Sequence, residues 1–509
     1  MSEKQLALTG SDLSLEDVER VALSRVERVT LSVEARKNVT RARAFVDRIV
    51  EEGRVVYGVT TGFGALADVV IPRERIRDLQ VNLIRSHAAG LGAPLPAAET
   101  RAVVLLRANV LAAGNSGARP EVVDLLLGLL NERIHPIIPE RGSVGASGDL
   151  APLSHLALVL IGEGEAELDG ECVSGAEALR RRGLAPVVLE AKEGLALNNG
   201  TQVMTGIGSL ALLRAERAVE TAEVAGAMSL EALRGTPDAF DESIQRLRPH
   251  PGQVESAARL RALLRDSEIR ESHRHGDPRV QDAYSLRCMP QVHGAARAGI
   301  AYIRSVLSTE INSVTDNPLL FPDEGRVISG GNFHGQPIAQ VLDLLAMVCA
   351  DVGAMSERRM ARLVDPALSG LPAFLTKDPG VNSGLMIAQI VAAALVADLR
   401  LRAHPASVDT VPTDANKEDH VSMGVGAALK AREAVQLLES ILAIELMTAA
   451  QALEFLRPLR AGSGVEAAHS LVREHVAALE EDRELAPDFR ALEARVREGR
   501  FANLWRTGM

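Results

Sequence analysis

Residues 209–234 read SLALLRAERAVETAEVAGAMSLEALR, a run dominated by alanine and leucine in which charged residues recur at helical spacing. No proline interrupts it, and residues 423–454 show the same pattern. Both segments exceed the usual globular helix of about 12 residues. Helices of that length with a wide apolar stripe need neighbours along their whole length. We therefore expect a mainly α protein with a long central bundle of antiparallel helices.

The segments before residue 200 show another pattern. Short β-prone and turn-rich pieces predominate, such as RVVYGVTTGFG at 54–64 and EAELDGECVSG at 165–175. We expect a mixed, loop-bearing N-terminal domain over residues 1–199 and a long-helix domain over residues 200–509. Loops are expected to interrupt the second domain at 313–318, 329–337, 403–420 and 457–464.

Composition and charge limit the classes of molecule that the protein can bind. Of the 509 residues 47% are hydrophobic but 3% aromatic, so alanine, leucine, valine and isoleucine must build the interior. The formal net charge of -11 argues against nucleic acid and anionic membranes, because both require concentrated lysine and arginine. Small molecules and other proteins remain as possible partners. We expect a homo-oligomer, because helix faces that one chain cannot cover would be buried between subunits.

The cysteines favour a reducing, cytoplasmic location. Cys172, Cys288 and Cys349 are odd in number, lack metal-ligand spacing and are expected to be buried thiols. The N-terminal segment has no sustained apolar region, so no signal peptide is expected. The longest uncharged run, 194–213, contains polar residues and glycines, which fits a buried segment better than a membrane span.

Unusual polar residues gather where the helical pattern is interrupted. The chain has three tyrosines, and two of them, Tyr57 and Tyr284, lie in short polar segments. The planar guanidinium of Arg287 matches a carboxylate, and Asn199 adds an amide donor. Together these residues suggest a site for a small zwitterion, with the tyrosines as candidate proton-transfer groups.

Each of these residues also has a structural interpretation. A tyrosine hydroxyl can pin a glycine-rich loop, Arg287 can form a buried ion pair, and His87 can be a hydrogen-bonded core histidine. Glu418 can cap the long helix that follows it. The sequence lacks a phosphate-binding loop, a dinucleotide fingerprint, a zinc-protease motif and a convincing Schiff-base lysine. A zwitterion site would therefore need an electrophile from another source.

GSVGASGDLAPLSH at 142–155 concentrates glycine and serine in one place, for which a tight turn is the simplest explanation. This motif closely resembles the signature of the aromatic amino acid ammonia-lyase family. Further motifs of that family occur in the expected order over nearly the whole chain: YGVTTGFG, SHAAGLGAPL, KEGLALNNGTQ, VQDAYSLRCMPQVHG, TDNPL, GGNFHGQPIA and KEDHVSMG. The resemblance implies the aspartase/fumarase-like lyase superfamily architecture and a homotetramer whose active sites draw residues from more than one subunit.

The resemblance also supplies the electrophile. In the family, an Ala-Ser-Gly tripeptide cyclises autocatalytically to 4-methylidene-imidazole-5-one (MIO), here from Ala146, Ser147 and Gly148, with no external cofactor and no metal. The Gly148 amide nitrogen must reach the Ala146 carbonyl carbon, a close approach that side chains would obstruct. Ser147 then loses water to leave an exocyclic methylidene. Such a strained segment persists only where its surroundings hold it.

The family's reaction eliminates ammonia from an α-amino acid and leaves a trans-α,β-unsaturated acid. By residue-by-residue match, Tyr57 is the base that takes the β-proton, and its usual pKa of about 10 has to be lowered or its proton held in a network. Arg287 binds the substrate carboxylate. The remaining matches are residues near the carboxylate and electrophile, Asn199 and Tyr284, and residues that line the pocket, Gln281 and Phe333. For the last of these, packing alone is an equal interpretation. Whether the amine or the ring attacks the electrophile stays open.

Glu418 carries the prediction of the substrate, because it puts a carboxylate where phenylalanine- and tyrosine-acting relatives tend to have glutamine. A carboxylate accepts a hydrogen bond from a ring N–H, whereas a phenyl ring would leave it unpaired. L-histidine is therefore the expected substrate and trans-urocanate the product, as in the first step of histidine degradation. His87, which follows Ser86, can bind an imidazole but also fits tyrosine-acting relatives. Lys417 departs from the family pattern, and it can pair with Glu418 or point to solvent.

Alternatives exist inside and outside the family. Inside it, a tyrosine or phenylalanine ammonia-lyase and an MIO-dependent 2,3-aminomutase would keep the same electrophile. Outside it, the chain could be a helical scaffold, an inactive relative or an aspartase-like lyase with a serine base. The intact tripeptide, together with Tyr57 and Arg287, argues against the second group.

Overall fold

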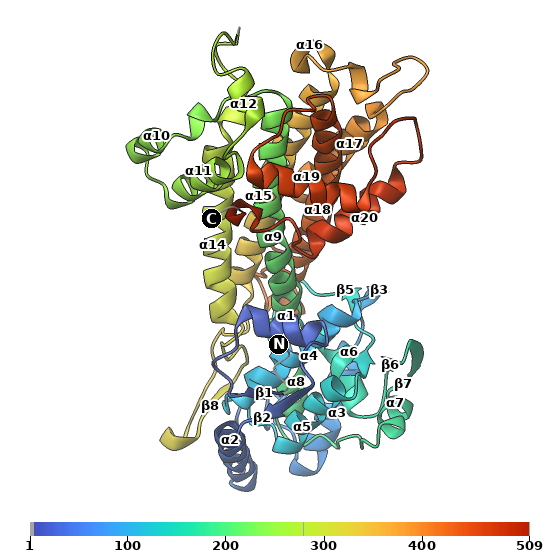
Figure 1. The fold of residues 1–509 in the computed structure, drawn as a ribbon. Coiled ribbons are helices and arrows are strands. Elements are labelled where there is room, and N and C mark those ends of the chain that lie inside the picture. Colours follow the sequence, from blue (N-terminus) through green and yellow to red (C-terminus); the bar gives the residue numbers. More distant parts are fainter. Residues whose placement is uncertain (1–4, 278, 508–509) are drawn as a thin grey trace. The chain divides into compact units, whose positions relative to one another are not determined.

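The computed structural model describes residues 5–277 and 279–507 (Figure 1). Helices make up most of the described chain and its strands are short, so the predicted mainly α class is confirmed. Contacts group the chain into two compact units, Met1–Leu210 with Arg304–Asp343 and Pro405–Leu429, and Ala211–Ile303 with Leu344–His404 and Lys430–Met509. Each unit joins three segments of chain, and the domain boundary expected at residue 200 stays a prediction.

Long helices contribute residues to both units. They are α9 (Gln202–Ala232), α14 (Met289–Glu310), α15 (Gln336–Val364) and α18 (Gly424–Glu454). The two alanine- and leucine-rich segments lie in α9 and α18, so the long helices predicted there are confirmed. These helices form because alanine and leucine have high helix propensity and no proline breaks the run.

The shorter helices belong to one unit each. The first unit contains α1 (Leu15–Ala22), α2 (Val33–Glu51), α3 (Ile76–His87), α4 (Ala97–Ala112), α5 (Pro120–Asn131), α6 (Leu150–Leu160), α7 (Gly175–Arg181) and α8 (Glu193–Asn198). The second unit contains α10 (Glu242–Leu247), α11 (Pro251–Leu263), α12 (Glu268–Ser272), α13 (Tyr284–Arg287), α16 (Pro366–Ser369), α17 (Met386–Arg402), α19 (Ser463–His475) and α20 (Ala486–Arg497).

The described strands all lie in the first unit and form small sheets. They are β1 (Gln5–Leu8), β2 (Arg28–Leu31), β3 (Leu91–Pro94), β4 (His135–Pro136), β5 (Pro139–Arg141), β6 (Glu165–Leu168), β7 (Glu171–Ser174), β8 (Leu319–Phe321) and β9 (Arg326–Ile328). β1 pairs with β2 in parallel, and the pairs β3–β5, β4–β6, β6–β7 and β8–β9 are antiparallel. Asp169 and Gly170 join β6 to β7 with positive φ at both residues, as a two-residue hairpin turn requires.

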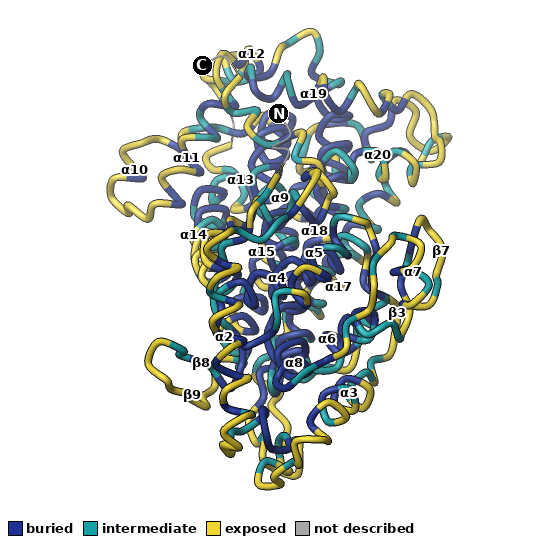
Figure 2. Tube along the Cα trace, turned by 90° about the horizontal axis from the view of Figure 1, so that it is seen from below, coloured by how far each residue is buried: buried dark blue, intermediate teal, exposed yellow. Residues whose placement is uncertain are grey.

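The core of the first unit contains α4, which is buried over almost its whole length (dark blue in Figure 2). This helix packs against α1 and α5. A second cluster joins Phe45 and Ile49 of α2 to Val59 and Leu320. Val59 lies two residues after Tyr57, so this cluster anchors the segment that carries the tyrosine.

Ion pairs and hydrogen bonds join the helices of the second unit. Arg359 of α15 and Glu445 of α18 are fully buried and form an ion pair. Ser229 of α9 also donates a hydrogen bond to Glu445. Arg297 of α14 pairs with Glu223 of α9. These contacts pack the four helices together as the predicted bundle, because a buried charge must find its partner on a neighbouring helix.

Helix α15 is long and apolar enough to cross a membrane by length and composition, the one such helix in the described chain. In the structure, 61% of its most apolar stretch is buried within the protein. A helix in the core of a folded protein is buried in this way, because neighbouring helices cover apolar side chains on most of its faces.

Candidate active site

The loop at 142–149 lies between β5 and α6 and contains glycines whose backbone conformation and close contacts strongly favour glycine. Gly148 has φ +74° and pairs with Gly200, and a Cβ on Gly148 would lie 2.2 Å from the Gly200 carbonyl oxygen. Gly145 has φ +71°, and a Cβ there would lie 2.2 Å from Oγ of Ser422. The chain bends at residues 145–147, and this bend lies against the segments that carry Gly200 and Ser422.

Asp149 fixes the end of this loop. Its backbone N–H donates to the Gly200 carbonyl at 2.7 Å. Its buried carboxylate accepts hydrogen bonds from the backbone N–H groups of Val203 and Met204, at 2.8 and 3.0 Å, in the first turn of α9. Burial raises the pKa of Asp149 to about 7, although both backbone hydrogen bonds oppose the rise. No role for Asp149 was predicted from the sequence, where its only signal is its place at the end of GSVGASGD.

Glu418 reaches the predicted tripeptide. Ser147 Oγ donates a hydrogen bond to Glu418 Oε1 at 2.9 Å, and Thr413 Oγ1 donates to the other carboxylate oxygen at 2.9 Å. The backbones of Thr413 and Glu418 also exchange two hydrogen bonds. Helix α18 begins only at Gly424, so Glu418 does not cap it. Lys417 is exposed and forms no ion pair within the described chain, which favours its pointing to solvent over its pairing with Glu418.

Tyr57 lies in the same unit, partly buried. Its Oη accepts a hydrogen bond from the Gly64 N–H at 3.2 Å. Burial raises the pKa of Tyr57, the Gly64 hydrogen bond lowers it, and the carboxylates of Asp414 and Glu418 raise it. Asp414 is held close by, since its carboxylate accepts from the Ala65 N–H at 2.9 Å. A tyrosine that acts as a base needs a lowered pKa. The residues around Tyr57 in its own unit do not lower its pKa overall.

His87 ends α3, and its Nδ1 lies 3.0 Å from Oγ of Ser86. The segment SHAAG at 86–90, which contains His87, contacts the motif GSVGASGDLAPLSH, because the Gly90 N–H donates a hydrogen bond to His155 Nε2 at 3.0 Å. His155 belongs to α6, which directly follows the loop. This bond attaches SHAAG to the helix that carries the end of GSVGASGDLAPLSH.

Asn199 is buried at the end of α8, and one of its polar side-chain atoms has no hydrogen-bond partner in the described chain. Its Nδ2 donates to Asp316 Oδ1 at 3.2 Å and to the Asn317 carbonyl at 3.1 Å. Its Oδ1 is buried and has no hydrogen-bond partner in the described chain. Asp316 is held in turn by Lys192, whose Nζ lies 2.8 Å away, with both side chains fully buried. The group that Asn199 can offer to a ligand is therefore an acceptor, not a donor.

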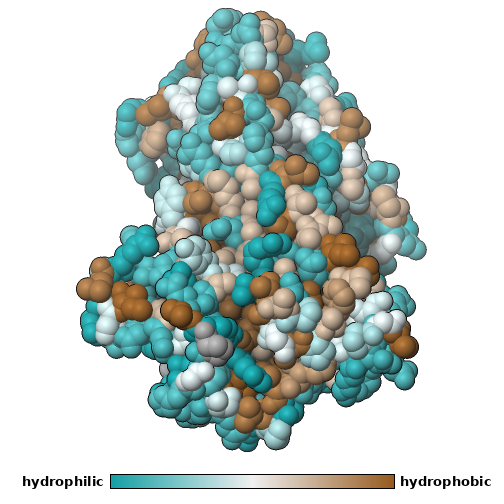
Figure 3. Space-filling model, turned by 90° about the horizontal axis from the view of Figure 1, so that it is seen from above, coloured by the Kyte–Doolittle hydropathy of each residue, from teal (hydrophilic) through white to brown (hydrophobic). Residues whose placement is uncertain are grey.

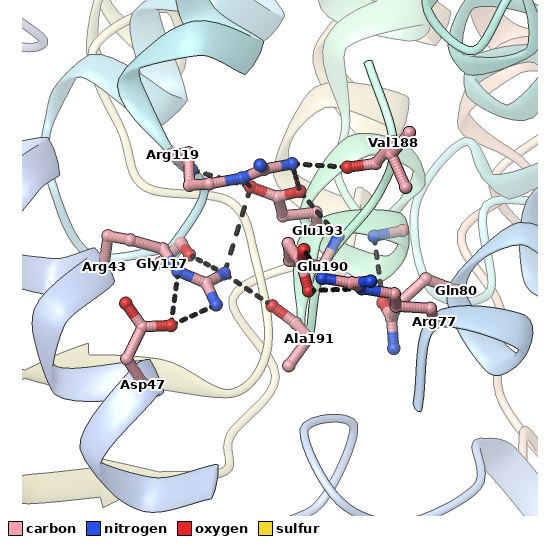
Figure 4. A network of polar contacts seen from close by, with 11 residues as sticks. Arg43, Asp47, Arg77, Gln80, Gly117, Arg119, Val188, Glu190, Ala191 and Glu193 are labelled. Carbon is pink, nitrogen blue, oxygen red and sulfur yellow. Dashed lines mark hydrogen bonds and ion pairs between the residues drawn. The ribbon is translucent and has the colours of Figure 1, made fainter. Parts of the chain in front are cut away.

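Further contacts fix α8, the helix that precedes Asn199 (Figure 4). The Glu193 carboxylate accepts hydrogen bonds from the backbone and side chain of Arg119, at 2.8 to 2.9 Å. Gln80 accepts from the Gly194 N–H at 2.9 Å, and Arg43 donates to the Ala191 carbonyl at 2.9 Å. Sequence reasoning missed these residues, because arginine and glutamate so far apart in the chain show no local pattern.

Phe333 is partly buried in the loop before α15. The ring of the next residue, His334, stacks on His420 with centroids 5.9 Å apart. Gly335 packs so closely on Met204 that a Cβ would lie 2.5 Å from the Met204 sulfur. These contacts hold the Phe333 loop against the segment that carries Glu418.

Gln281, Tyr284 and Arg287 belong to the second unit. The guanidinium carbon of Arg287 lies 4.7 Å from the centroid of the Tyr284 ring, a cation–π contact. Tyr284 is 70% exposed and Gln281 is also exposed. Arg287 forms no ion pair in the described chain, and its buried Nε has no partner. The ion-pair interpretation of Arg287 thus finds no carboxylate here.

Within the described residues, no cluster of three or more histidine, cysteine, aspartate or glutamate side chains could hold a metal ion. In the first unit, the contacts above bring Ser147 and Glu418 together and put Tyr57 under the influence of the same carboxylate. A carboxylate, a phenol and a cyclisable tripeptide can hold and move protons beside a reacting substrate.

Comparison with known proteins gives consistent matches. A model of aromatic amino acid lyases matches residues 13–474. The histidine ammonia-lyase of Anaeromyxobacter dehalogenans (strain 2CP-C) is 56% identical over 502 residues, which cover 97% of this chain and 99% of the relative. The crystal structure of a histidine ammonia-lyase from Trypanosoma cruzi has a TM-score of 0.92 and 44% identity, covering 99% of this chain and 95% of the other. A tyrosine aminomutase from Streptomyces globisporus has a TM-score of 0.93 and 39% identity, covering 99% of both chains.

Proposed function

Because the chain belongs to the aromatic amino acid lyase family, we propose that it is a carbon–nitrogen lyase that eliminates ammonia from L-histidine and releases trans-urocanate. The observation that carries the choice of substrate is the hydrogen bond between Ser147 and Glu418, which puts a carboxylate beside the tripeptide. A ring N–H of histidine can satisfy that carboxylate, and a phenyl or phenol ring cannot do so in the same way. The relatives named as histidine ammonia-lyases support the same substrate.

We assign the electrophile to an MIO group formed from Ala146, Ser147 and Gly148. The Gly148 nitrogen bonds to the Ala146 carbonyl carbon, and the carbonyl oxygen and the Ser147 hydroxyl leave as two water molecules. The loop supports this assignment, because Gly148 lies against Gly200 with no space for a side chain and Asp149 holds its C-terminal end. The MIO group supplies an electrophilic methylidene carbon to the substrate.

Tyr57 is our choice for the base that takes the β-proton. Burial and two carboxylates raise its pKa, so the phenol is protonated at neutral pH before substrate binds. Positive charge must therefore come close to Tyr57 during the reaction, and the substrate ammonium and the Arg287 guanidinium both carry it. Their approach favours the phenolate and lets Tyr57 accept the proton.

Four further residues bind the substrate in this proposal. Arg287 has an unpartnered donor for the carboxylate, and Glu418 accepts from the ring. Asn199 offers its unpartnered Oδ1, so we assign it to a substrate N–H instead of the carboxylate role that the sequence suggested. His87 binds near the ring. Gln281 and Phe333 keep the predicted role of lining the pocket.

We propose a homotetramer with shared active sites. Tyr284 is 70% exposed although the resemblance assigns it to the active site, which fits a residue that completes the site of another subunit. Ile387, Ile390 and Leu401 of α17 are 56%, 52% and 68% exposed, and Figure 3 shows hydrophobic residues, in brown, on the surface of the molecule. Exposed apolar side chains of this size on one helix favour burial against another copy of the chain.

A cytoplasmic location fits the cysteines, which are all free. Cys349 is buried as expected, but Cys172 is exposed and Cys288 is only partly buried, so the expectation that all three are buried was wrong for Cys172 and Cys288. The reason is that Cys172 lies in the short β6–β7 hairpin, where one face of each strand meets solvent. An exposed free thiol persists most easily in a reducing compartment.

The decisive experiment measures urocanate formation by its ultraviolet absorbance with L-histidine, L-tyrosine and L-phenylalanine as separate substrates. We expect turnover of L-histidine alone. Cinnamate or coumarate formation, or a β-amino acid product, would identify the chain as a phenylalanine or tyrosine lyase or an aminomutase. Intact-protein mass spectrometry tests the electrophile separately, with an expected mass two waters below that of the encoded chain. Ser147→Ala should lack the loss of water from residue 147 and most of the activity.

A further inference from the structure

A cavity of about 540 Å³ in the first unit shares no residue with the candidate active site. It lies where the segment after α1, the start of α4 and the end of α5 meet. The lining contains four arginines and one glutamate: Arg20, Arg25, Arg101, Arg133 and Glu27. Its volume is within the range of small-molecule sites, about 300–1,000 Å³.

Arg101 of α4 is the buried member of this group, with 5% of its surface exposed. Its Nε donates to the Val21 carbonyl and its Nη1 to the Leu130 carbonyl, both at 2.9 Å. Both partners are neutral, and no ion pair with a carboxylate is found for Arg101 among the described residues. Burial, together with the charge of Arg133, lowers the pKa of Arg101 to about 10. A buried cation without a counterion is costly, so this position favours an anion.

The other charges around the cavity do not remove this surplus. Arg20 pairs with Asp17 at 3.0 Å and Arg25 also has an interaction partner, so neither is counted as an unpaired charge. Glu27 is the acidic residue of the lining. Arg133 is exposed at the end of α5. His135, which follows in β4, has its pKa lowered by burial and by the charge of Arg101, so it is neutral near pH 7 and adds no positive charge.

The walls of the cavity are held in place without a ligand. Asn131 accepts a hydrogen bond from the Val29 N–H at 2.8 Å and donates to the Val29 carbonyl at 2.9 Å, which ties α5 to β2. The two hydrogen bonds of Arg101 tie α4 to the carbonyls of Val21 in α1 and Leu130 in α5. A site with preorganised walls loses little free energy to ordering when a ligand binds.

We propose that this arginine cavity binds a small anion through phosphate or carboxylate groups, with Arg101 and Arg133 as its principal partners. A guanidinium presents parallel N–H groups that match two oxygens of either group. The volume of the cavity accommodates a molecule larger than chloride. Phosphate and carboxylate ligands share this chemistry and are distinguished by the probes below.

The test is isothermal titration calorimetry of the full-length protein with pyrophosphate and, separately, citrate, in chloride buffer of constant ionic strength. We expect one binding site per chain for at least one of these anions, and the preferred probe identifies the phosphate or the carboxylate class. Arg133→Gln should raise the dissociation constant about tenfold or more, as expected for the loss of one charge-assisted contact.

Two controls make the outcome specific. Arg28→Gln removes one positive charge from an exposed residue of β2 outside the lining and should bind like the unaltered protein. Arg287→Gln removes the carboxylate-binding arginine proposed for the active site and should also leave this binding unchanged. The proposal is overturned by absence of binding of both probes, by equal affinity in Arg133→Gln and Arg28→Gln, or by loss of binding in Arg287→Gln.

Discussion

Glu418 makes two contacts with different consequences for chemistry. One oxygen is held by Thr413, and the other accepts a hydrogen bond from Ser147. The Thr413 bond fixes the carboxylate, so the oxygen toward Ser147 is positioned before substrate arrives. Replacing Ser147 by a group without a hydroxyl, as cyclisation and dehydration do, frees that oxygen for another donor, and a histidine ring N–H is such a donor.

Glu418→Gln should therefore lower kcat/KM for L-histidine by about 10- to 100-fold, because a hydrogen bond to a charged group is worth roughly 1.5–3 kcal/mol. Steady-state urocanate formation measures this effect. Lys417→Gln is the matched control, since its side chain is exposed next to the same position and its loss should leave kcat/KM unchanged. Equal kcat/KM in Glu418→Gln and the unaltered enzyme would remove Glu418 from substrate recognition.

Asp414 offers a test of Tyr57 as the base. The negative charge of Asp414 contributes to the raised pKa of Tyr57, so Asp414→Asn should lower that pKa and still accept from the Ala65 N–H. If the phenolate is the active form, kcat/KM rises with pH, and in Asp414→Asn this rise should occur at lower pH. The pH profile of kcat/KM measures the shift, and Tyr57→Phe should lack the rise. A rise that stays in place or moves to higher pH contradicts the proposal.

At this scale, the sequence predicted residue types better than residue contacts. The match to a family placed Ser147 and Glu418 in one site, and the structure shows a hydrogen bond between them although they are 271 positions apart in the sequence. The role of Asp149 could not be predicted, because its partners are backbone N–H groups at the start of α9. Almost every residue has a backbone N–H group, so the sequence does not indicate which ones Asp149 contacts. The unpartnered acceptor atom of Asn199 could not be predicted either, because it depends on the hydrogen bond that the Asn199 amide nitrogen donates to Asp316.

Among the elements, α9, α12 and the loop before α19 meet at a buried carboxyl group. Glu231 of α9 accepts from Ser267 Oγ at 2.8 Å and from the Gly462 N–H at 3.1 Å. Burial raises its pKa from 4.5 to about 7, more than these hydrogen bonds lower it. Between these two values, the folded protein holds a proton that the unfolded chain has released. The contribution of Glu231 to stability therefore falls as pH rises from about 4.5 to 7.

Glu231→Gln should stabilise the protein above pH 7, by about 3 kcal/mol at most, because glutamine keeps an acceptor for Gly462 and carries no charge to bury. Thermal unfolding at pH 5.5 and pH 8.5 measures this, and the gain in Tm should be larger at the higher pH. Glu484→Gln, at an exposed position, should change Tm little at either pH. A gain that is the same at both pH values, or larger at pH 5.5, contradicts the argument.

The long helices and the β6–β7 hairpin were predictable because their signals are local: an alanine- and leucine-rich run in one case and an Asp-Gly turn in the other. The grouping of elements was not. Residues 304–343 and 405–429 join the first unit through contacts such as Asn199 with Asp316 and Ser147 with Glu418. Contacts of this kind connect loops, and loop sequences carry no periodicity from which a partner could be found.

In the whole molecule, the proposed site residues are divided between the two units of the chain. Tyr57 lies in the first unit, and Arg287 lies beside the exposed Tyr284 in the second unit. If active sites are shared, a site takes Tyr57 from one chain and Arg287 from another. Tyr57→Phe and Arg287→Gln should each be nearly inactive as pure proteins. In a tetramer assembled from both, a site is intact where a normal Tyr57 meets a normal Arg287.

Random co-assembly of equal amounts of the two variants should restore about one quarter of normal activity, because each half of a shared site is intact with a chance of about one half. Urocanate formation by co-expressed, differently tagged chains measures this. The matched control co-expresses unaltered chain with the double variant Tyr57→Phe/Arg287→Gln. Shared sites again give about one quarter there, whereas sites built within one chain give about one half in the control and none in the mixture of single variants.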